Sequence, residues 1–312
     1  MKIIYCVEND VDKNGFIKIA QNSMIDYLKS SEHQLTIVTP SNDIDLTDCD
    51  LVIFYGIYSR ALHQVTQHKK LLYDKLVKAK KGLLIIEKGF INRKQYYSIG
   101  FNSNVGYGYY HNANSPDDRF KQLKCQLKPN THQKNGYILL CGQIPHDSQI
   151  QHLTPEQYLE FLQSTVDQIK KVSQRQIVFR GHPKYKKQIN LLGAIPSKNP
   201  KLIDDLRQAY AVVGFNSNSL LEAMMEGYPV FVLDRGSVVY PIANHDLTQI
   251  ENTATLWANA NPKDKYQIFS NIAYAQWNAT EIRNGKAFKH IIKGYSNAIE
   301  RLGKNEPNFS LE

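Results

Sequence analysis

The sequence has few cysteines, and their spacing excludes two common ways of building a small scaffold. Four cysteines, Cys6, Cys49, Cys125 and Cys141, are scattered through 312 residues. No pair has the Cys-x-x-Cys spacing, so neither a dense disulfide framework nor a cysteine zinc site is indicated. We interpret the four thiols as reduced and mostly structural.

Long apolar runs are also missing. No segment reaches the roughly 18 uninterrupted apolar residues that a membrane-spanning helix requires. Residues 1–7 contain neither the apolar stretch nor the cleavage site of a secretory signal, and they are typical of a strand. We therefore expect no integral membrane association and a cytoplasmic location. Repeats of solenoid period and low-complexity tracts are absent as well.

Positive charge, in contrast, is in excess. The chain has 38 Lys and Arg against 29 Asp and Glu, a formal net charge of +9. Such an excess favours an anionic partner, which includes a nucleotide, a nucleic acid or a membrane surface. A lysine-rich solvated surface is the alternative explanation, and net charge alone does not choose among these.

Short apolar runs alternate with amphipathic stretches along the whole chain, which predicts an α/β fold with mostly parallel sheets. In the first half we expect strands near Ile3–Val7, Leu35–Val38, Leu51–Tyr55 and Leu83–Glu87, and helices near Phe16–Leu28 and His68–Lys80. Segment 102–134 loses this periodicity and is rich in Asn, Gly, Pro, Asp and Lys. Since 312 residues suffice for two ordinary domains, we place them at 1–134 and 135–312.

The second half repeats the design. We expect strands at Tyr137–Cys141, Gln176–Arg180, Ala211–Val213 and Val230–Leu233, and helices at Pro155–Val172, near Pro200–Ala209 and from Ser219 onward. The last part, about Lys263–Gly303, is helical in pattern with a basic final stretch. We hypothesise that this tail packs back on the N-terminal domain.

The segment from Gly214 to Val230 carries the strongest chemical signal. A buried strand leads into Asn216-Ser217-Asn218-Ser219, which can cap a helix that ends at Gly227-Tyr228-Pro229. Unpaired N–H groups at the helix start, with the Asn and Ser side chains around them, can bind a diphosphate. Glu222, about one turn in, is placed to accept hydrogen bonds from ribose hydroxyls. An ordinary capped helix with a solvent-facing Glu222 is the alternative.

A second signal is Arg180-Gly181-His182-Pro183-Lys184, where another buried strand ends in a cluster of donors. Arg180 or Lys184 can neutralise a phosphate, and a neutral His182 can donate one N–H to a phosphate oxygen. Gly181 allows a close approach of the backbone. The alternative is a loop histidine beside solvated basic residues.

These two motifs, in this order, resemble the donor half of the capsule-polysaccharide, Kdo-transferase-like glycosyltransferases of the GT-B fold. Gln143, Asp147 and Ser148, just after the first strand of the second half, add to the resemblance. It covers about Tyr137–Pro241 and implies two Rossmann-like domains facing each other across a cleft. It also implies a nucleotide-sugar donor, with the diphosphate and ribose contacted by His182, Ser217, Ser219 and Glu222. The first half departs from these enzymes, so the acceptor is not carried over.

The first half supplies candidates for binding the acceptor. Glu87 follows a buried strand, where open α/β sheets present catalytic groups, and it can act as general base for an acceptor hydroxyl. A loop carboxylate paired to Lys88 or Arg93 is the alternative. Arg93 is a candidate phosphate contact, and Tyr96 and Tyr97 open a tyrosine-rich stretch suited to stacking on sugars or bases. Aromatic packing under a long loop explains the same composition.

One motif is set aside. Asp43-Ile44-Asp45 and Asp48-Cys49-Asp50 imitate an Asp-x-Asp metal site, but they precede the strand at Leu51. They therefore lie at its amino end, opposite the expected ligand cleft. We predict no metal site and no cofactor, because the nucleotide sugar is a co-substrate.

Taken together, the motifs predict a metal-independent glycosyltransferase in which domain 135–312 binds the donor and domain 1–134 binds the acceptor. His182, Arg180 and the helix start would stabilise the departing diphosphate. The basic, compact chain favours double-stranded DNA with hydroxymethylated bases as the acceptor, as in phage DNA-modifying enzymes. A capsule or cell-surface saccharide acceptor is the main alternative. A nucleotide-sugar epimerase and a non-catalytic nucleotide-binding protein are further alternatives.

Overall fold

The structure, a computed structural model, describes residues 1–7, 15–39, 44–57, 64–103, 105–150, 152–257, 261–304 and 308–309, with only the backbone of 64–66. The chain divides into two compact units. Unit 1 contains Met1–Leu123 and Phe269–Asn308, and unit 2 contains Lys124–Ile268. The C-terminal segment thus belongs to the same unit as the N-terminus. No helix among the described residues has both the length and the apolar character needed to cross a bilayer.

Unit 1 is built on a six-stranded sheet in the order β11-β5-β4-β3-β1-β2. Its strands are β1 (Lys2–Cys6), β2 (Gln34–Val38), β3 (Leu51–Tyr55), β4 (Gly82–Lys88), β5 (Tyr96–Phe101) and β11 (Gln276–Asn278). The first four are parallel and lie where apolar runs predicted them. β5 is antiparallel to β4, and β11 is antiparallel to β5. Neither β5 nor β11 was predicted.

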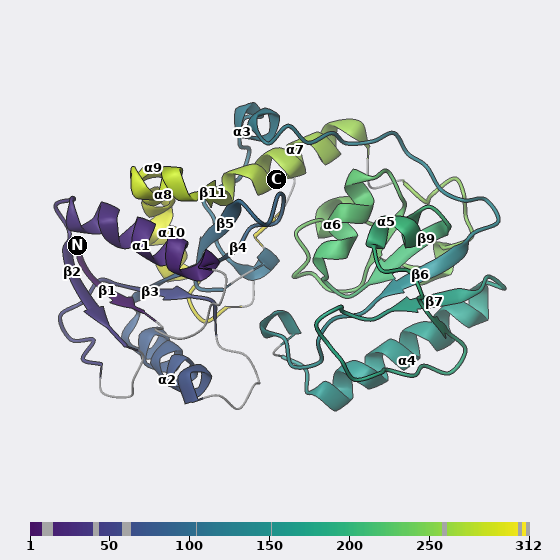
Figure 1. Cartoon of the computed structure of the whole chain (residues 1–312), viewed down its shortest axis with the longest axis horizontal. Helices are drawn as coiled ribbons and strands as arrows, with labels where there is room; N and C mark the ends of the chain where they lie inside the picture. Colours follow the sequence, from purple (N-terminus) through teal and green to yellow (C-terminus); the bar gives the residue numbers. More distant parts are fainter. Residues whose placement is uncertain are drawn as a thin grey trace. The chain divides into compact units, whose positions relative to one another are not determined.

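Helices cover both faces of this sheet (Figure 1). α2 (Gln64–Ala79) packs Leu72 and Leu76 on one face, which confirms the predicted helix there. The other face holds α1 (Phe16–Lys29) and the C-terminal helices α8 (Ala279–Arg283), α9 (Lys286–Ile291) and α10 (Tyr295–Glu300). The remaining helical elements of this unit are η1 (Val105–Tyr107), α3 (Asp118–Gln122), the end of α7 (Pro262–Tyr274) and η5 (Ile292–Gly294).

The C-terminal tail is fixed to unit 1 through buried polar groups. The fully buried Gln276 of β11 accepts hydrogen bonds through Oε1 from the N–H groups of Phe90 and Ile91, at 2.8 and 2.9 Å. Arg119 of α3 forms an ion pair with Glu281 of α8, with Nη1 and Oε1 2.6 Å apart. Buried polar groups are costly when unpaired, so these bonds stabilise the packing of the tail. The Gln276 bonds hold it to the loop after β4, and the Arg119 ion pair holds it to α3.

Unit 2 has a fully parallel five-stranded sheet in the order β10-β9-β6-β7-β8. Its strands are β6 (Tyr137–Cys141), β7 (Ile177–Arg180), β8 (Ile195–Pro196), β9 (Ala209–Gly214) and β10 (Val230–Val232). α4 (Pro155–Val172) packs Tyr158, Leu162 and Val166 against one face. α5 (Leu202–Leu206) and α6 (Asn218–Met225) lie against the other (Figure 1). Short turns η2 (Ser148–Ile150), η3 (Tyr240–Ile242) and η4 (Leu247–Gln249) complete the unit.

The two units therefore confirm the predicted α/β class, with a mostly or fully parallel sheet in each. The expected boundary near residue 134 lies eleven residues beyond the division at Leu123 and Lys124. The roles given to the two domains, and a cleft between them, stay predictions.

Candidate functional site

Three of the sequence motifs begin where three neighbouring strands of the unit 2 sheet end. Cys141, at the end of β6, is paired in register with Arg180 of β7 on one side and with Gly214 of β9 on the other. The three chain segments that follow these residues therefore start side by side, since neighbouring strands are about 4.8 Å apart. This edge is the carboxyl edge of a parallel sheet, where α/β proteins bind ligands.

A buried polar network joins two of these segments. Asn216 is 2% exposed and Gln143 3% exposed. Gln143 Nε2 donates to Asn216 Oδ1 at 2.8 Å, and Asn216 N–H donates to Gln143 Oε1 at 3.3 Å. Asn216 Nδ2 donates to Gln149 O at 3.0 Å and to Asp234 Oδ2 at 2.6 Å. The network fixes the starts of the loops after β6 and β9 relative to each other.

The start of α6 lies directly after this network. Ser217 is the N-cap residue, and its Oγ accepts from the Ser219 N–H at 3.4 Å and lies 2.7 Å from Ser219 Oγ. Ser219 also forms a hydrogen bond with the Cys141 thiol, whose pKa is raised to about 12 by burial. A helix start with its N–H groups and partial positive charge favours an anion. Ser217 and Ser219 lie at this edge of the sheet, and both are half-buried.

Two further donor-binding candidates lie in α6, Asn218 at its first position and Glu222 one turn later. Asn218 Nδ2 donates to Glu222 Oε1 at 3.0 Å, and Glu222 is exposed to solvent. The position one turn into the helix is as predicted. The proposed contact of Glu222 with a ribose stays a prediction.

His182 lies in the loop after β7 and is half-buried. Its Nδ1 accepts a hydrogen bond from the Lys184 N–H at 3.2 Å. An accepting Nδ1 carries no proton in the neutral ring, so the proton is on Nε2. In this tautomer His182 can donate from Nε2, and its contact with a phosphate stays a prediction.

Arg180 bonds to α5 and to the segment before it. Its Nη1 donates to Asp205 Oδ2 at 2.6 Å and to Asn199 O at 2.8 Å, and its Nη2 donates to Pro200 O at 3.0 Å. The Asp205 side chain is 1% exposed, so this ion pair is almost fully desolvated. The structure thus places the Arg180 guanidinium against Asp205 of α5 and the segment before it, and its contact with a phosphate stays a prediction.

Asp147 and Ser148 form a turn at the carboxyl edge. Asp147 Oδ1 accepts from the Gln149 N–H at 3.0 Å and from the Ser148 hydroxyl at 3.3 Å, at the start of η2. The turn brings Gln149 back to Gln143, whose Nε2 lies 3.2 Å from Gln149 Oε1. Asp147 and Ser148 therefore shape the loop, and their contact with a donor stays a prediction.

Glu87, in unit 1, lies at the carboxyl end of β4 beside the end of β3. It is half-buried, and its Oε1 accepts from the Lys88 N–H at 3.0 Å. A Cβ atom on Gly56 would be 3.3 Å from Glu87 Oε2 and 3.9 Å from Lys69 Nζ, so both groups approach Gly56. The Lys69 side chain is buried and donates to Tyr55 O at 2.6 Å. This carboxylate and ammonium therefore both lie near Gly56, at the end of β3.

Of the three acceptor-binding candidates in unit 1, two are at least partly exposed and one is buried. Arg93 is exposed and Tyr96 is half-buried in β5. Tyr97 is 2% exposed, stacks on Phe16 with ring centroids 4.3 Å apart, and donates its hydroxyl to Phe16 O at 2.9 Å. A ring with no exposed face has no room for a sugar or base, so the assignment of Tyr97 to the acceptor is wrong.

The acidic motifs set aside earlier do lie before β3. Asp48 forms an ion pair with Lys2, and Asp45 accepts hydrogen bonds from Thr47. Asp50 accepts from the Lys2 N–H, while Asp43 is outside the described residues. No group of three or more potential metal-ligating side chains occurs in the described part of the chain.

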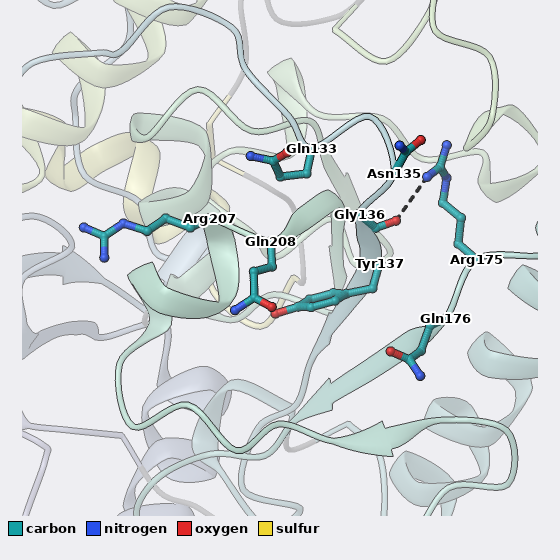
Figure 2. A pocket seen from close by; sticks show the side chains of 8 residues that line it. All are labelled: Gln133, Asn135, Gly136, Tyr137, Arg175, Gln176, Arg207 and Gln208. Carbon is teal, nitrogen blue, oxygen red and sulfur yellow. Dashed lines mark hydrogen bonds between the residues drawn. The ribbon is translucent and has the colours of Figure 1, made fainter.

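A cavity of about 400 Å³ lies at the opposite edge of the unit 2 sheet (Figure 2). Its lining residues precede β6, β7 and β9, and Arg175 Nη1 donates across its rim to Gly136 O at 3.1 Å. The cavity is lined by Gln133, Asn135, Gly136, Tyr137, Arg175, Gln176, Arg207 and Gln208. Because it lies at the amino ends of the strands, it is separate from the candidate site.

Sequence reasoning missed three members of the site. Asp234 is the second residue after β10, and it accepts from Asn216 and from the Gly236 N–H. The rule that selected Asn216, a polar residue after a buried strand, applies equally to Asp234. Gln149 was passed over beside Asp147. Tyr158 looked apolar in the pattern of α4, yet its hydroxyl accepts from the Gln143 N–H at 2.8 Å.

No protein-family model and no curated protein matches the chain. Solved structures do match it. The KpsC beta Kdo 2,7 transferase of Thermosulfurimonas dismutans is 12% identical, with a TM-score of 0.45 over 94% of this chain and 99% of that one. The KpsC beta Kdo 2,4 transferase of the same organism is 11% identical, with a TM-score of 0.47 over 87% and 89%. T4 phage BGT in complex with UDP and Mn²⁺ is 12% identical, with a TM-score of 0.30 over 96% and 99%.

Proposed function

We propose that the chain is a glycosyltransferase that moves a sugar from a nucleotide-sugar donor to a hydroxyl acceptor. The observation that carries this proposal is the carboxyl edge of the unit 2 sheet. There the buried pair Gln143 and Asn216 fixes the start of α6 beside the loop that holds His182. A helix start and a neutral histidine donor, presented from adjacent strands, suit a diphosphate.

In the proposed reaction, the bond between the anomeric carbon and the diphosphate oxygen breaks as the acceptor oxygen bonds to that carbon. The α6 N–H groups and His182 Nε2–H stabilise the charge that develops on the leaving diphosphate. Glu87 of unit 1 takes the proton of the acceptor hydroxyl. These donors serve in place of a metal ion, and we propose that no cofactor takes part.

For the acceptor we favour a hydroxymethylated base in double-stranded DNA, on the basis of the net charge of +9. A capsule or cell-surface saccharide is the second candidate, favoured by the donor-site motifs. The test uses labelled nucleotide sugar with each acceptor in turn. Incorporation into hydroxymethylated duplex but not into oligosaccharide is expected, and the reverse result would establish the saccharide.

Donor binding is tested first by a thermal-shift screen of nucleoside diphosphates and nucleotide sugars. A ligand that binds only the folded state raises the apparent melting temperature. We expect a shift for at least one nucleotide sugar that is lost in His182→Ala. Glu87→Gln should retain the shift and lose transfer, and a chelator should leave transfer unchanged. Conversion of the nucleotide sugar without any acceptor would instead show an epimerase, and binding without turnover a non-catalytic protein.

A further inference from the structure

Unit 1 contains a second cavity, of about 550 Å³, far along the chain from every donor-site motif. It is formed by α3, the end of α7, β11, α8, α9 and η5. This volume is in the range of ligand-binding pockets, about 300–1,000 Å³. None of the residues assigned to the donor or acceptor lines it.

The rim of this cavity is positively charged. Lys286, Lys289 and Lys293 line it and are exposed, and in the described part of the chain none of the three ammonium groups has a recorded ion-pair partner. The spacing of three and four residues places them on one face of α9 and its continuation in η5. We call this face the lysine rim. Three exposed lysines on one face favour anion binding over a salt-bridged surface, although the Glu281 carboxylate of the same cavity acts on Lys286.

The carboxylates of the cavity are already engaged. Glu281 is held by the Arg119 guanidinium, and the Tyr274 hydroxyl donates to Asp118 at 2.9 Å. Arg119 also lies 3.8 Å above the centre of the Trp277 ring, so it belongs to the floor rather than the rim. The positive potential of the lysine rim is therefore only weakly offset from within the cavity.

The geometry favours an extended anion over a single phosphate. From Lys286 to Lys293 the helix advances about 10 Å, at 1.5 Å per residue. The phosphates of one strand of a duplex follow each other every 3.4 Å along the helix axis. The lysine rim is thus long enough to contact about three successive phosphates.

We propose that the lysine rim of unit 1 binds the phosphodiester backbone of a nucleic acid. The proposal bears on the acceptor in the proposed function, but it concerns backbone binding alone and requires no sugar transfer. Because lysines contact phosphates and leave the base edges unread, binding is independent of base sequence and strongly dependent on salt.

The test measures the affinity for an unmodified duplex of random sequence at several salt concentrations. Each lysine that contacts a phosphate contributes about 0.9 to the slope of log K against log salt. Replacing Lys286, Lys289 and Lys293 by alanine should reduce the slope by about 2.7, and replacing them by arginine should preserve it. The control variant replaces Lys18, Lys29 and Lys78, exposed lysines of α1 and α2 in the same unit, and removes the same charge.

Equal weakening by the rim variant and the control variant would overturn the proposal, because net charge alone would then explain binding. Binding of anionic phospholipid vesicles in place of the duplex would overturn it as well. Nucleotide-sugar binding, followed by thermal shift, should be unchanged in both lysine variants. Loss of duplex binding with intact donor binding therefore separates this proposal from the proposed function.

Discussion

Asn216 is the residue that holds the candidate donor site together, because it bonds to two other segments: Gln143 and Gln149 after β6, and Asp234 after β10. Asn216→Ala removes one hydrogen-bond partner from each of the buried residues Asp234 and Gln143, and we expect it to lower the free energy of unfolding by about 1–3 kcal/mol. Asn218→Ala is the matched control, since Asn218 contacts only the exposed Glu222, and it should change stability by less than about 0.5 kcal/mol. Urea denaturation of both variants checks this, and similar losses would contradict the role of Asn216.

Arg180 offers a test between two roles. If its guanidinium serves Asp205, Arg180→Ala leaves a buried carboxylate uncompensated and should cost about 3–5 kcal/mol of stability. Arg180→Lys should recover part of this loss, because the lysine keeps the charge but not the forked geometry. The measurement is again equilibrium unfolding in urea. An Arg180→Ala protein of normal stability with weak donor binding would favour the phosphate role.

His290 makes the stability of unit 1 depend on pH. Burial, with a smaller contribution from the neighbouring His111, lowers the pKa of His290 from 6.5 to about 4. Above pH 6.5 the imidazole is neutral in both states. As the pH falls from 6.5 to about 4, the unfolded chain binds a proton that the folded protein does not bind, so the free energy of unfolding decreases. The positive charges of Lys293 and Arg119 add to this effect, and the pKa of the Glu281 carboxyl, which burial alone would raise, is lowered by its bonds to Arg119.

The prediction is checked by measuring unfolding in urea at several pH values between 6.5 and 4. His290→Gln should show a flatter dependence than the unaltered protein in this window. A parallel dependence in the two proteins would mean that other groups are responsible.

At the scale of elements, the start of α6 is the part on which donor binding depends most. Ser217→Ala removes the N-cap and should cost about 1 kcal/mol of stability. It should also weaken nucleotide binding, because Ser217 lies at the proposed diphosphate position. Thr154→Ala removes the cap of α4, which has the same kind of bond to Gln157, and should cost about the same. Titration calorimetry should show weaker binding for Ser217→Ala only, and an equal effect of Thr154→Ala would contradict a local role.

Most elements were predictable because their sequence pattern is local. β3, β6 and α4 occur within the limits that apolar runs or helical periodicity gave them. β5 was not recognised, because its tyrosines and its Ser98-Ile99-Gly100 segment resembled a loop. β11 is short, and its partner β5 lies almost two hundred residues earlier, so no local pattern indicates it.

The residues of the candidate site were also predictable only where a local sequence pattern indicates them. Asn216 and Ser217 could be selected from the strand-to-helix turn in which they occur. Asp234 acquires its role only because β10 lies next to β9, and this order follows from tertiary packing. The role of Arg180 depends likewise on Asp205, whose burial is set by the position of α5.

At the scale of the whole molecule, the two units have different roles in the proposed reaction. The carboxyl edge of unit 2 carries the proposed donor site, and unit 1 carries Glu87 and the lysine rim. The lysine rim contributes part of the net charge of +9 at one defined place, and its role can be tested by substitution. It contributes to association through long-range attraction, which weakens as salt is added.

The central claim is that the carboxyl edge of unit 2 binds the diphosphate of a nucleotide sugar. Its most direct test is calorimetric titration of the nucleotide sugar that gives the largest thermal shift, into the unaltered protein and into His182→Ala and Ser217→Ala. We predict binding at one site that is at least about tenfold weaker in each variant, equivalent to about 1.4 kcal/mol. Unchanged affinity in both variants, with the fold intact, would place the nucleotide elsewhere and contradict the account.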